Sequence, residues 1–199
     1  MYSRKSSFVL GFHGTDEELG LEILNGKKNF KPSENSYDWL GNGIYFWENN
    51  PKRAMDFAKL ENKRNPGKVK KPFVLGAVLD LGNCFDLLSQ EYIDFLQKAY
   101  KLLVSDLKER NHVLPENRGF SENDFDFKKR ELDCAVIRYA LGLAEKAGCL
   151  FDSVLSSFWE GKELYKNSGF KQFNHVQIAI RNIDCIKGVF LPRKKNDSV

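Results

Sequence analysis

The first stretch with residues suited to chemistry is His13-Gly14-Thr15, which follows a short apolar run. We expect a strand over Phe8–Phe12, which places the His13 imidazole at a strand end, where it can hydrogen-bond a ligand. Gly14 has no side chain, so a ligand can approach its backbone N–H and C=O groups closely. A packed histidine beside a turn glycine is the alternative interpretation.

The second stretch, DWLGNGIYFW, places a glycine-rich turn directly before an aromatic strand. Gly41 and Gly43 suit a tight turn, and Ile44–Trp47 has the β-branched and aromatic character of a strand. The ring of Tyr45 offers a stacking face to a flat aromatic ligand, and Phe57 on the helix expected next can supply a second face. An ordinary core tyrosine after a hairpin turn is the alternative.

The third stretch, NHVQIAIRN, has the period-2 alternation of a strand. The alternation predicts a core face made of Val176, Ile178 and Ile180. His175 and Gln177 then project together from the opposite face, where burial without hydrogen-bond partners would be costly. A cleft at this position resolves the conflict.

The remaining pattern predicts one α+β domain. Strands are mixed with helices without clean βαβ units, and two long helical segments are expected over 90–110 and 126–147. The four cysteines form no C-x-x-C pair, and we therefore expect no zinc or other metal site. No apolar run is long enough for a membrane span or a signal peptide, so we expect a cytoplasmic protein without a membrane partner.

In this order, the three stretches resemble the sequential motifs of the ADP-ribosyltransferases of the diphtheria-toxin and poly(ADP-ribose) polymerase branch, the H-Y-E class. The match covers strands near both ends of the chain and the first helix. It implies a single ADP-ribosyltransferase-like domain over 1–199, built on a split β-sheet with flanking helices. The helices of about 90–147 have no counterpart and would form an insertion.

The resemblance also implies roles for individual residues in binding NAD. Residues expected to contact the dinucleotide are His13, Gly14, Thr15, Gly43, Tyr45 and Phe57. Gly14 would hold the nicotinamide carboxamide through its backbone, His13 would bond the adenosine ribose, and Tyr45 would stack on the nicotinamide ring. Ungapped alignment places Asp56 where the polymerases have a second aromatic residue, so Phe57 is displaced by one position.

Gln177 falls where the class has its catalytic glutamate. A glutamine can accept a hydrogen bond from the ribose 2′-hydroxyl, but it carries no charge and cannot act as a base. We therefore expect single transfer rather than polymer elongation, with His13, Tyr45, Gln177 and His175 as the catalytic set. His175 is a candidate base, as are Glu160 and Glu163 in the preceding loop, where the superfamily recognises its acceptor. Solvated loop carboxylates are the alternative for both glutamates.

The expected function is therefore NAD-dependent mono-ADP-ribosylation, typical of small bacterial toxins and phage-defence effectors, with an antitoxin as a possible partner. The basic segment Lys63–Lys71 and the pair Phe158-Trp159 slightly favour an RNA or DNA acceptor, because lysines track phosphates and aromatics stack bases. A protein acceptor is the alternative. A non-catalytic NAD or ADP-ribose binding module, an RNA 2′-phosphotransferase and an NAD hydrolase also stay open.

Overall fold

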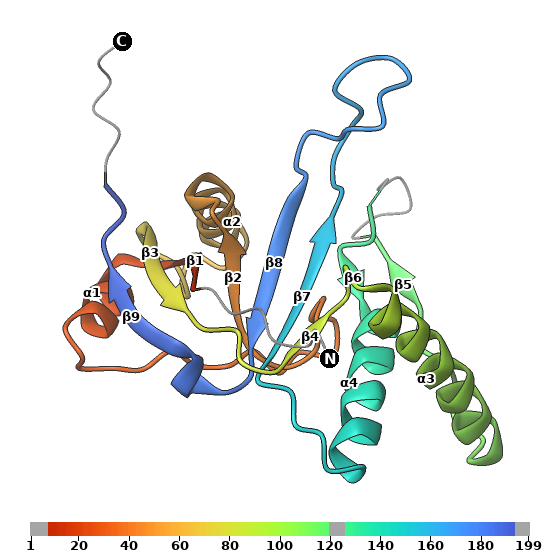
Figure 1. Ribbon diagram of the computed structural model, residues 1–199. Helices are drawn as coiled ribbons and strands as arrows, with labels where there is room; N and C mark the ends of the chain where they lie inside the picture. The colour runs from red at the N-terminus through yellow and green to blue at the C-terminus, as the bar shows by residue number, and fades with distance from the viewer. Residues whose placement is uncertain (1–7, 120–125, 194–199) are drawn as a thin grey trace.

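The computed structural model describes residues 8–119 and 126–193. A mixed sheet of seven strands runs through the centre of the molecule in the order β4-β7-β8-β2-β1-β3-β9 (Figure 1). These strands are β1 Val9–Asp16, β2 Ile44–Glu48, β3 Pro72–Leu79, β4 Cys84–Asp86, β7 Ser153–Phe158, β8 His175–Ile180 and β9 Ile186–Phe190. The pairs are antiparallel except β4 with β7, and this arrangement is consistent with the expected α+β class.

Four α-helices accompany the sheet in the described part of the chain: α1 Glu17–Leu24, α2 Pro51–Arg64, α3 Gln90–Glu109 and α4 Glu131–Lys146. A short 3₁₀ helix, Ile183–Cys185, precedes β9. The Asn50 side chain caps α2, with Pro51 in the first turn. Among the described residues, no helix combines the length and apolar character needed to cross a membrane.

The fourth helix begins later than the expected residue 126. Residues Lys129–Arg130 instead form β6, which pairs with β5 (Asn117–Arg118) in a small second sheet. The Asp126 carboxylate is used by another segment, since it accepts a hydrogen bond from the backbone N–H of Gly161 at 2.7 Å. A tertiary contact therefore replaces the first helical turn that the sequence pattern indicates.

The first strand is longer than the expected Phe8–Phe12. It pairs with β3 from Val9 to Asp16, so Thr15 is a strand residue. Asp16 caps α1 by accepting a hydrogen bond from the N–H of Glu18, and it also accepts bonds from the N–H groups of Lys70 and Lys71. The Asp16 carboxylate therefore ties the start of α1 to the chain that enters β3.

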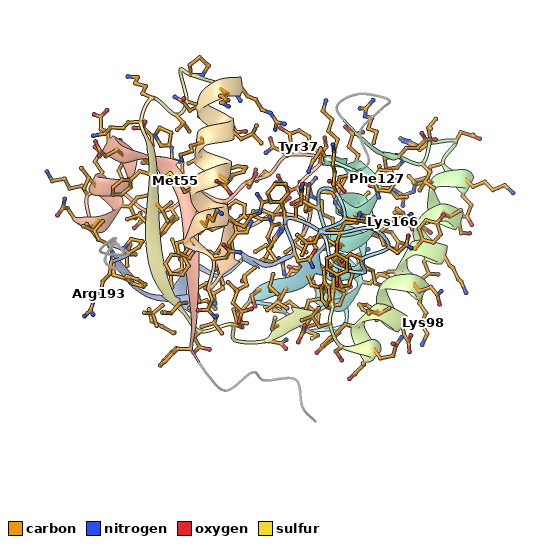
Figure 2. The ribbon with its side chains drawn as sticks, turned by 90° about the horizontal axis from the view of Figure 1, so that it is seen from above. Tyr37, Met55, Lys98, Phe127, Lys166 and Arg193 are labelled. Carbon is orange, nitrogen blue, oxygen red and sulfur yellow. The ribbon has the colours of Figure 1, made fainter. Side chains whose placement is uncertain are left out.

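The two faces of the sheet are covered differently. One face carries an apolar core beneath α1. Its largest fully buried side chains are Phe46, Leu75, Leu79, Leu81, Leu155, Ile178 and Ile180. On the other face, α2 packs over β1 and β3 while α3 and α4 pack over β4 and β7. Seen from above, Met55 of α2 and Lys98 of α3 lie on opposite sides, with Phe127 and Lys166 between them (Figure 2). The part of this face formed by β2 and β8 lies between the two groups of helices.

Candidate functional site

The three stretches singled out in the sequence lie on adjacent strands. His13 is in β1, Tyr45 in β2 and Gln177 in β8, and these strands are neighbours in the order β8-β2-β1. The registers place Phe12 opposite Trp47, and Trp47 opposite Gln177. Segments more than a hundred residues apart in the chain therefore meet at the centre of the sheet.

His13 bridges the first two strands through its side chain. The β1–β2 ladder ends at the pair Phe12 and Trp47, and beyond it His13 Nδ1 donates to the carbonyl oxygen of Tyr45 at 2.8 Å. Burial lowers the pKa of His13. The neutral ring packs edge-on against Phe30 and lies beside Phe46, on the face opposite Gln177. The structure therefore joins His13 to the β2 backbone and not to the Gln177 side chain.

Gly14 lies just past the last β1–β2 pair. A Cβ atom at this position would come within 2.1 Å of the Ala54 carbonyl oxygen, so the glycine permits close packing of α2 on β1. Backbone groups alternate in direction along a strand, and the Leu10 carbonyl accepts from Asn49 on the β2 side. Gly14 is four residues after Leu10, so its N–H and C=O groups also point toward the β2 side of the strand. The β1–β2 ladder has already ended at this position.

Thr15 is buried against α1 on the face of the sheet opposite α2. The structure does not bring its side chain together with Gln177. Thr15 instead lies against the α1 glycine, Gly20, where a Cβ would be 3.2 Å from its methyl carbon. Thr15 therefore contributes to the packing of α1 against β1.

Tyr45 closes the glycine turn with its own hydroxyl. This group donates to the Gly41 carbonyl at 2.6 Å and accepts from the N–H of Leu40 at 2.8 Å, and burial raises the pKa of Tyr45. Its ring packs on the side of α4. Gly43 is needed because a Cβ there would lie 3.0 Å from the Ile180 carbonyl oxygen of β8.

Phe57 takes a different neighbour from the one expected. Its ring lies 5.1 Å from that of Trp47, whereas Tyr45 packs toward α4. Trp47 follows Tyr45 by two residues and lies on the same strand face. Its ring is beside Phe57, in the place that the resemblance gives to the nicotinamide ring. The described ring contacts do not pair Tyr45 with Phe57.

Buried polar atoms without partners gather around Gln177. Trp47 Nε1, Arg53 Nε, His175 Nε2 and Gln177 Oε1 have no hydrogen-bond partner. Trp47 is 4% exposed, and His175 and Gln177 are each 7% exposed. Most buried polar groups in proteins are hydrogen-bonded, so four such atoms in one neighbourhood indicate a binding site. The expected alternation of β8 is confirmed, since Ile178 and Ile180 join the core on the other face.

His175 holds a defined tautomer. Its Nδ1 lies 2.7 Å from the carbonyl oxygen of Phe173, which can only accept, so the proton is on Nδ1 and the Nε2 lone pair is unpaired. Burial lowers the pKa of His175, and the charges of Arg53 and Lys128 act in the same direction against the opposing effect of Glu160. The neutral ring can therefore accept a proton or a hydrogen bond at Nε2.

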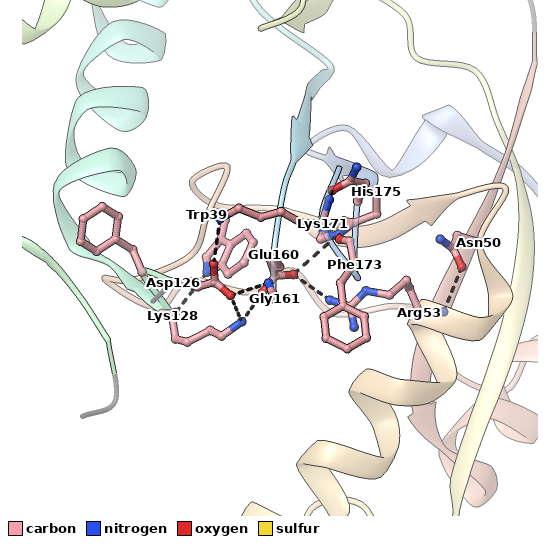
Figure 3. A network of polar contacts seen from close by, with 12 residues as sticks. Trp39, Asn50, Arg53, Asp126, Lys128, Glu160, Gly161, Lys171, Phe173 and His175 are labelled. Atoms are coloured by element: carbon pink, nitrogen blue, oxygen red, sulfur yellow. Dashed lines mark hydrogen bonds and ion pairs between the residues drawn. The ribbon is translucent and has the colours of Figure 1, made fainter. Parts of the chain in front are cut away.

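Glu160 is the centre of a charged cluster beside this ring (Figure 3). One carboxylate oxygen contacts Arg53 Nη2 at 2.7 Å and lies 3.7 Å from His175 Nδ1, and the other binds Lys128 Nζ. The residue is 3% exposed, so the interpretation as a solvated loop carboxylate is wrong for Glu160. Glu163 is exposed, and its carboxylate accepts a hydrogen bond from the N–H of Asn167.

A second carboxylate, Asp126, extends the cluster. It lies 3.5 Å from Lys128 Nζ and 3.7 Å from Lys171 Nζ. The cluster thus combines three cations, Arg53, Lys128 and Lys171, with the two carboxylates of Glu160 and Asp126. The positive excess favours an anionic ligand or partner on this side of the sheet.

Three site residues were missed in the sequence. Trp47 could have been found, because alternation along β2 places it on the same face as Tyr45. Arg53 and Lys128 gave no comparable signal, since their role depends on Glu160, which is distant in the chain. In the described ranges, no three histidine, cysteine, aspartate or glutamate residues are grouped to hold a metal ion, and none of the four cysteines forms a disulfide.

Comparison with known proteins gives one relative and no functional assignment. The chain is 24% identical over 194 residues to the uncharacterized protein MJ0359 of Methanocaldococcus jannaschii, covering 88% of this chain and 83% of that protein. No protein-family model matches the chain. No solved structure matches it either.

Proposed function

We propose that the protein is an NAD-dependent mono-ADP-ribosyltransferase. The observation that carries the proposal is that β1, β2 and β8, which bear His13, Tyr45 and Gln177, are neighbouring strands, and that four buried polar atoms on the Gln177 side have no partner. The short β1–β2 ladder, which gives way to the His13 bridge, supports a split sheet of the ADP-ribosyltransferase kind. The helices α3 and α4 would then be the insertion.

In the proposed reaction, the bond between nicotinamide N1 and the ribose C1′ breaks and its electron pair leaves with nicotinamide. A bond forms between C1′ and a nucleophilic atom of the acceptor, whose proton passes to a base. The transition state resembles an oxocarbenium ion, as in glycoside cleavage, and groups that orient the ribose and the acceptor would accelerate it.

The residues around β2 and β8 fit parts of the dinucleotide. Gln177 Oε1 is an unpaired acceptor that a ribose hydroxyl can satisfy, and the Gly14 backbone offers a donor and an acceptor suited to a carboxamide. Trp47 Nε1 and Arg53 Nε are unpaired donors that suit phosphate or hydroxyl oxygens. Tyr45 and Phe57 would bind the nicotinamide ring only if it enters beside Trp47, whose ring contacts Phe57.

The base for the acceptor is assigned to His175. Its Nε2 is unprotonated and faces no protein partner. Glu160 acts on His175 and Arg53 as a positioning residue, because both of its oxygens are held by cations. A carboxylate next to this histidine would stabilise the imidazolium formed when His175 accepts a proton.

The acceptor is proposed to be nucleic acid, and the biological role that of a toxin or defence effector with an antitoxin partner. The cation excess around Glu160 supports an anionic acceptor over a neutral one. Most of Lys63–Lys71 is exposed, and Lys71 pairs with Glu17 of α1. A polyanion can therefore approach this basic segment from solvent.

The test is incubation with NAD labelled in its adenine, with RNA, DNA or cell protein added separately, while nicotinamide release and label transfer are followed. Wild-type protein should release nicotinamide and label one pool. Gln177→Leu should lose about tenfold or more in release, because the hydrogen bond to the ribose is removed, whereas Gln172→Leu in the exposed loop should match wild type. No release from folded wild-type protein would overturn the proposal.

A non-catalytic NAD or ADP-ribose binding module is the second candidate, and the uncharged Gln177 favours it. Calorimetric titration separates the two functions. Binding of NAD without nicotinamide release or label transfer would establish the module, and Gln177 would then mark a site adapted to hold the dinucleotide intact.

A further inference from the structure

A cavity of about 610 Å³ lies between the helices α3 and α4 and the C-terminal end of β7. This volume is within the range of small-molecule sites, about 300–1,000 Å³. The cavity is distinct from the unpaired polar atoms at Gln177, and the Phe158-Trp159 pair singled out in the sequence lies in its wall. Its walls come mainly from the helical insertion, which supplies Lys128 to the cluster around Glu160 but none of the residues proposed to contact NAD.

The cavity is next to the proposed NAD site, because two residues of its wall are paired with Gln177 and His175 in the sheet. Ser156 lines the cavity and stands directly opposite Gln177 in the β7–β8 ladder, on the same face of the sheet. Phe158, another wall residue, stands opposite His175, and their ring centroids are 5.7 Å apart. A molecule in the cavity would therefore lie next to the base proposed for the acceptor.

Aromatic rings form much of the wall near this boundary. Trp39 and Phe158 pack with their centroids 4.8 Å apart, and the Arg130 guanidinium stacks over both, at 4.3 Å and 4.9 Å. Tyr100 and Trp159 line the cavity from α3 and from the end of β7. Flat aromatic faces with a stacked arginine suit a planar heteroaromatic ring.

Polar side chains stand among these rings. Gln97 and Ser156 line the cavity with groups that can donate and accept hydrogen bonds, and the Asp133 carboxylate, which accepts from Asn117 and Arg130, adds acceptors alone. Such groups suit the polar edge of a nucleobase better than an aliphatic chain, which would leave them unpaired on burial. Arg130 lines the cavity among these rings, and its positive charge suits a phosphate next to the bound base.

We propose that this cavity binds a nucleobase of single-stranded nucleic acid and thereby presents the acceptor to the NAD site. The part of the proposal that concerns the acceptor rests on the proposed function, whereas binding of the base does not. A single strand is required because a base that is paired and stacked within a duplex has no free face to offer the rings of the cavity.

The test is a titration without NAD. The probes are single-stranded RNA and DNA oligomers of about eight nucleotides, the same sequences as duplexes, and an abasic sugar-phosphate oligomer of equal length. The wild-type protein should bind a single strand with a Kd about tenfold or more below that of the abasic oligomer, because base stacking on aromatic side chains supplies that margin.

Two pairs of variants locate the binding. Gln97→Trp fills the mouth of the cavity from an exposed position of α3, and Ser105→Trp is its control on the same helix outside the cavity. Trp159→Ala removes a wall ring that is 60% exposed, and Tyr165→Ala is its control in the same loop at 63% exposed. Both cavity variants should raise the Kd for single strands about tenfold and leave abasic binding unchanged, and both controls should match wild type.

Equal affinity for the abasic oligomer and the single strands, or unchanged Kd in both cavity variants, would overturn the proposal. A preference for duplex would also overturn it. Its failure is separable from failure of the transferase proposal. Cavity-dependent binding of bases without nicotinamide release upholds the base site alone, whereas release without base binding upholds only the NAD chemistry.

Discussion

Strand β7 has a carboxylate just beyond each end, and the two are used in opposite ways. Before the strand, Asp152 accepts from the Asn83 N–H at 2.9 Å and from Asn182 Nδ2 at 2.9 Å, while its backbone carbonyl accepts from the N–H groups of Arg181 and Asn182. Gly82 turns beneath it with a φ of 57°, where a Cβ would lie 2.4 Å from an Asp152 oxygen. At this end of the sheet, both carboxylate oxygens and the backbone carbonyl of Asp152 accept hydrogen bonds from within the protein.

After the strand, Glu160 binds cations rather than backbone amides, and unpaired buried atoms surround it. In the described residues, the buried unpaired side-chain atoms belong to Trp47, Arg53, Arg138, His175 and Gln177, and only Arg138 lies outside this neighbourhood. Buried polar groups that are all hydrogen-bonded within the protein stabilise its fold, whereas buried polar groups without a partner can form hydrogen bonds with a ligand. The difference separates the structural carboxylate of Asp152 from Glu160, which lies in the candidate site.

The largest effect on stability is expected at Asp152. Asp152→Ala should lower the free energy of unfolding by about 2–4 kcal/mol, because two donors lose their acceptor. Urea unfolding monitored by circular dichroism measures the change. Asp152→Asn keeps one acceptor oxygen and should lose less. A loss of stability below about 0.5 kcal/mol for the alanine variant would show that Asp152 does not stabilise this end of the sheet.

A smaller loss is expected at Glu160. Glu160→Gln should lower the free energy of unfolding by about 1–3 kcal/mol, since Arg53 and Lys128 lose their counter-charge but are partly exposed and remain solvated. The exposed Glu163→Gln should stay within about 0.5 kcal/mol of wild type. Nicotinamide release should fall in the Glu160 variant alone. Equal stability and release in both variants would mean that Glu160 does not position the site.

A pH dependence is expected from His175. Its folded pKa lies below the ordinary value, so between the two values only the unfolded state binds the proton, and stability falls as pH drops below about 6.5. The slope from this group is at most about 1.4 kcal/mol per pH unit. The lowered pKa of His13 adds a contribution of the same sign. His175→Asn should therefore flatten the loss between neutral and mildly acidic pH in part, as measured by unfolding at several pH values.

The smallest effect on stability is expected at Gln177, and it has the opposite sign. Gln177→Leu should leave the free energy of unfolding within about 1 kcal/mol of wild type or raise it, because an unpaired buried oxygen is replaced by apolar atoms. Thermal unfolding of the ligand-free protein tests this. A loss of about 3 kcal/mol or more would show that the Gln177 amide is needed for the fold, and the comparison with Asp152 would then fail.

The sequence by itself determined the local structure well where the signals are local. Alternation placed His175 and Gln177 on one face of β8, opposite the core residues Ile178 and Ile180. Periodicity predicted a helix over 90–110, and the observed helix α3 spans Gln90–Glu109. These features depend on neighbours within a few residues, so the amino-acid order contains them.

Only the tertiary structure decided which of these residues share a site. It placed His13 and Thr15 on the face opposite Gln177, paired Phe57 with Trp47, and buried Glu160 between Arg53 and Lys128. Ion pairs and ring contacts of this kind join segments that no local pattern relates, because they depend on strand register and on where a helix crosses the sheet. The sequence therefore determined the strands that carry the chemistry, and packing decided which side chains meet there.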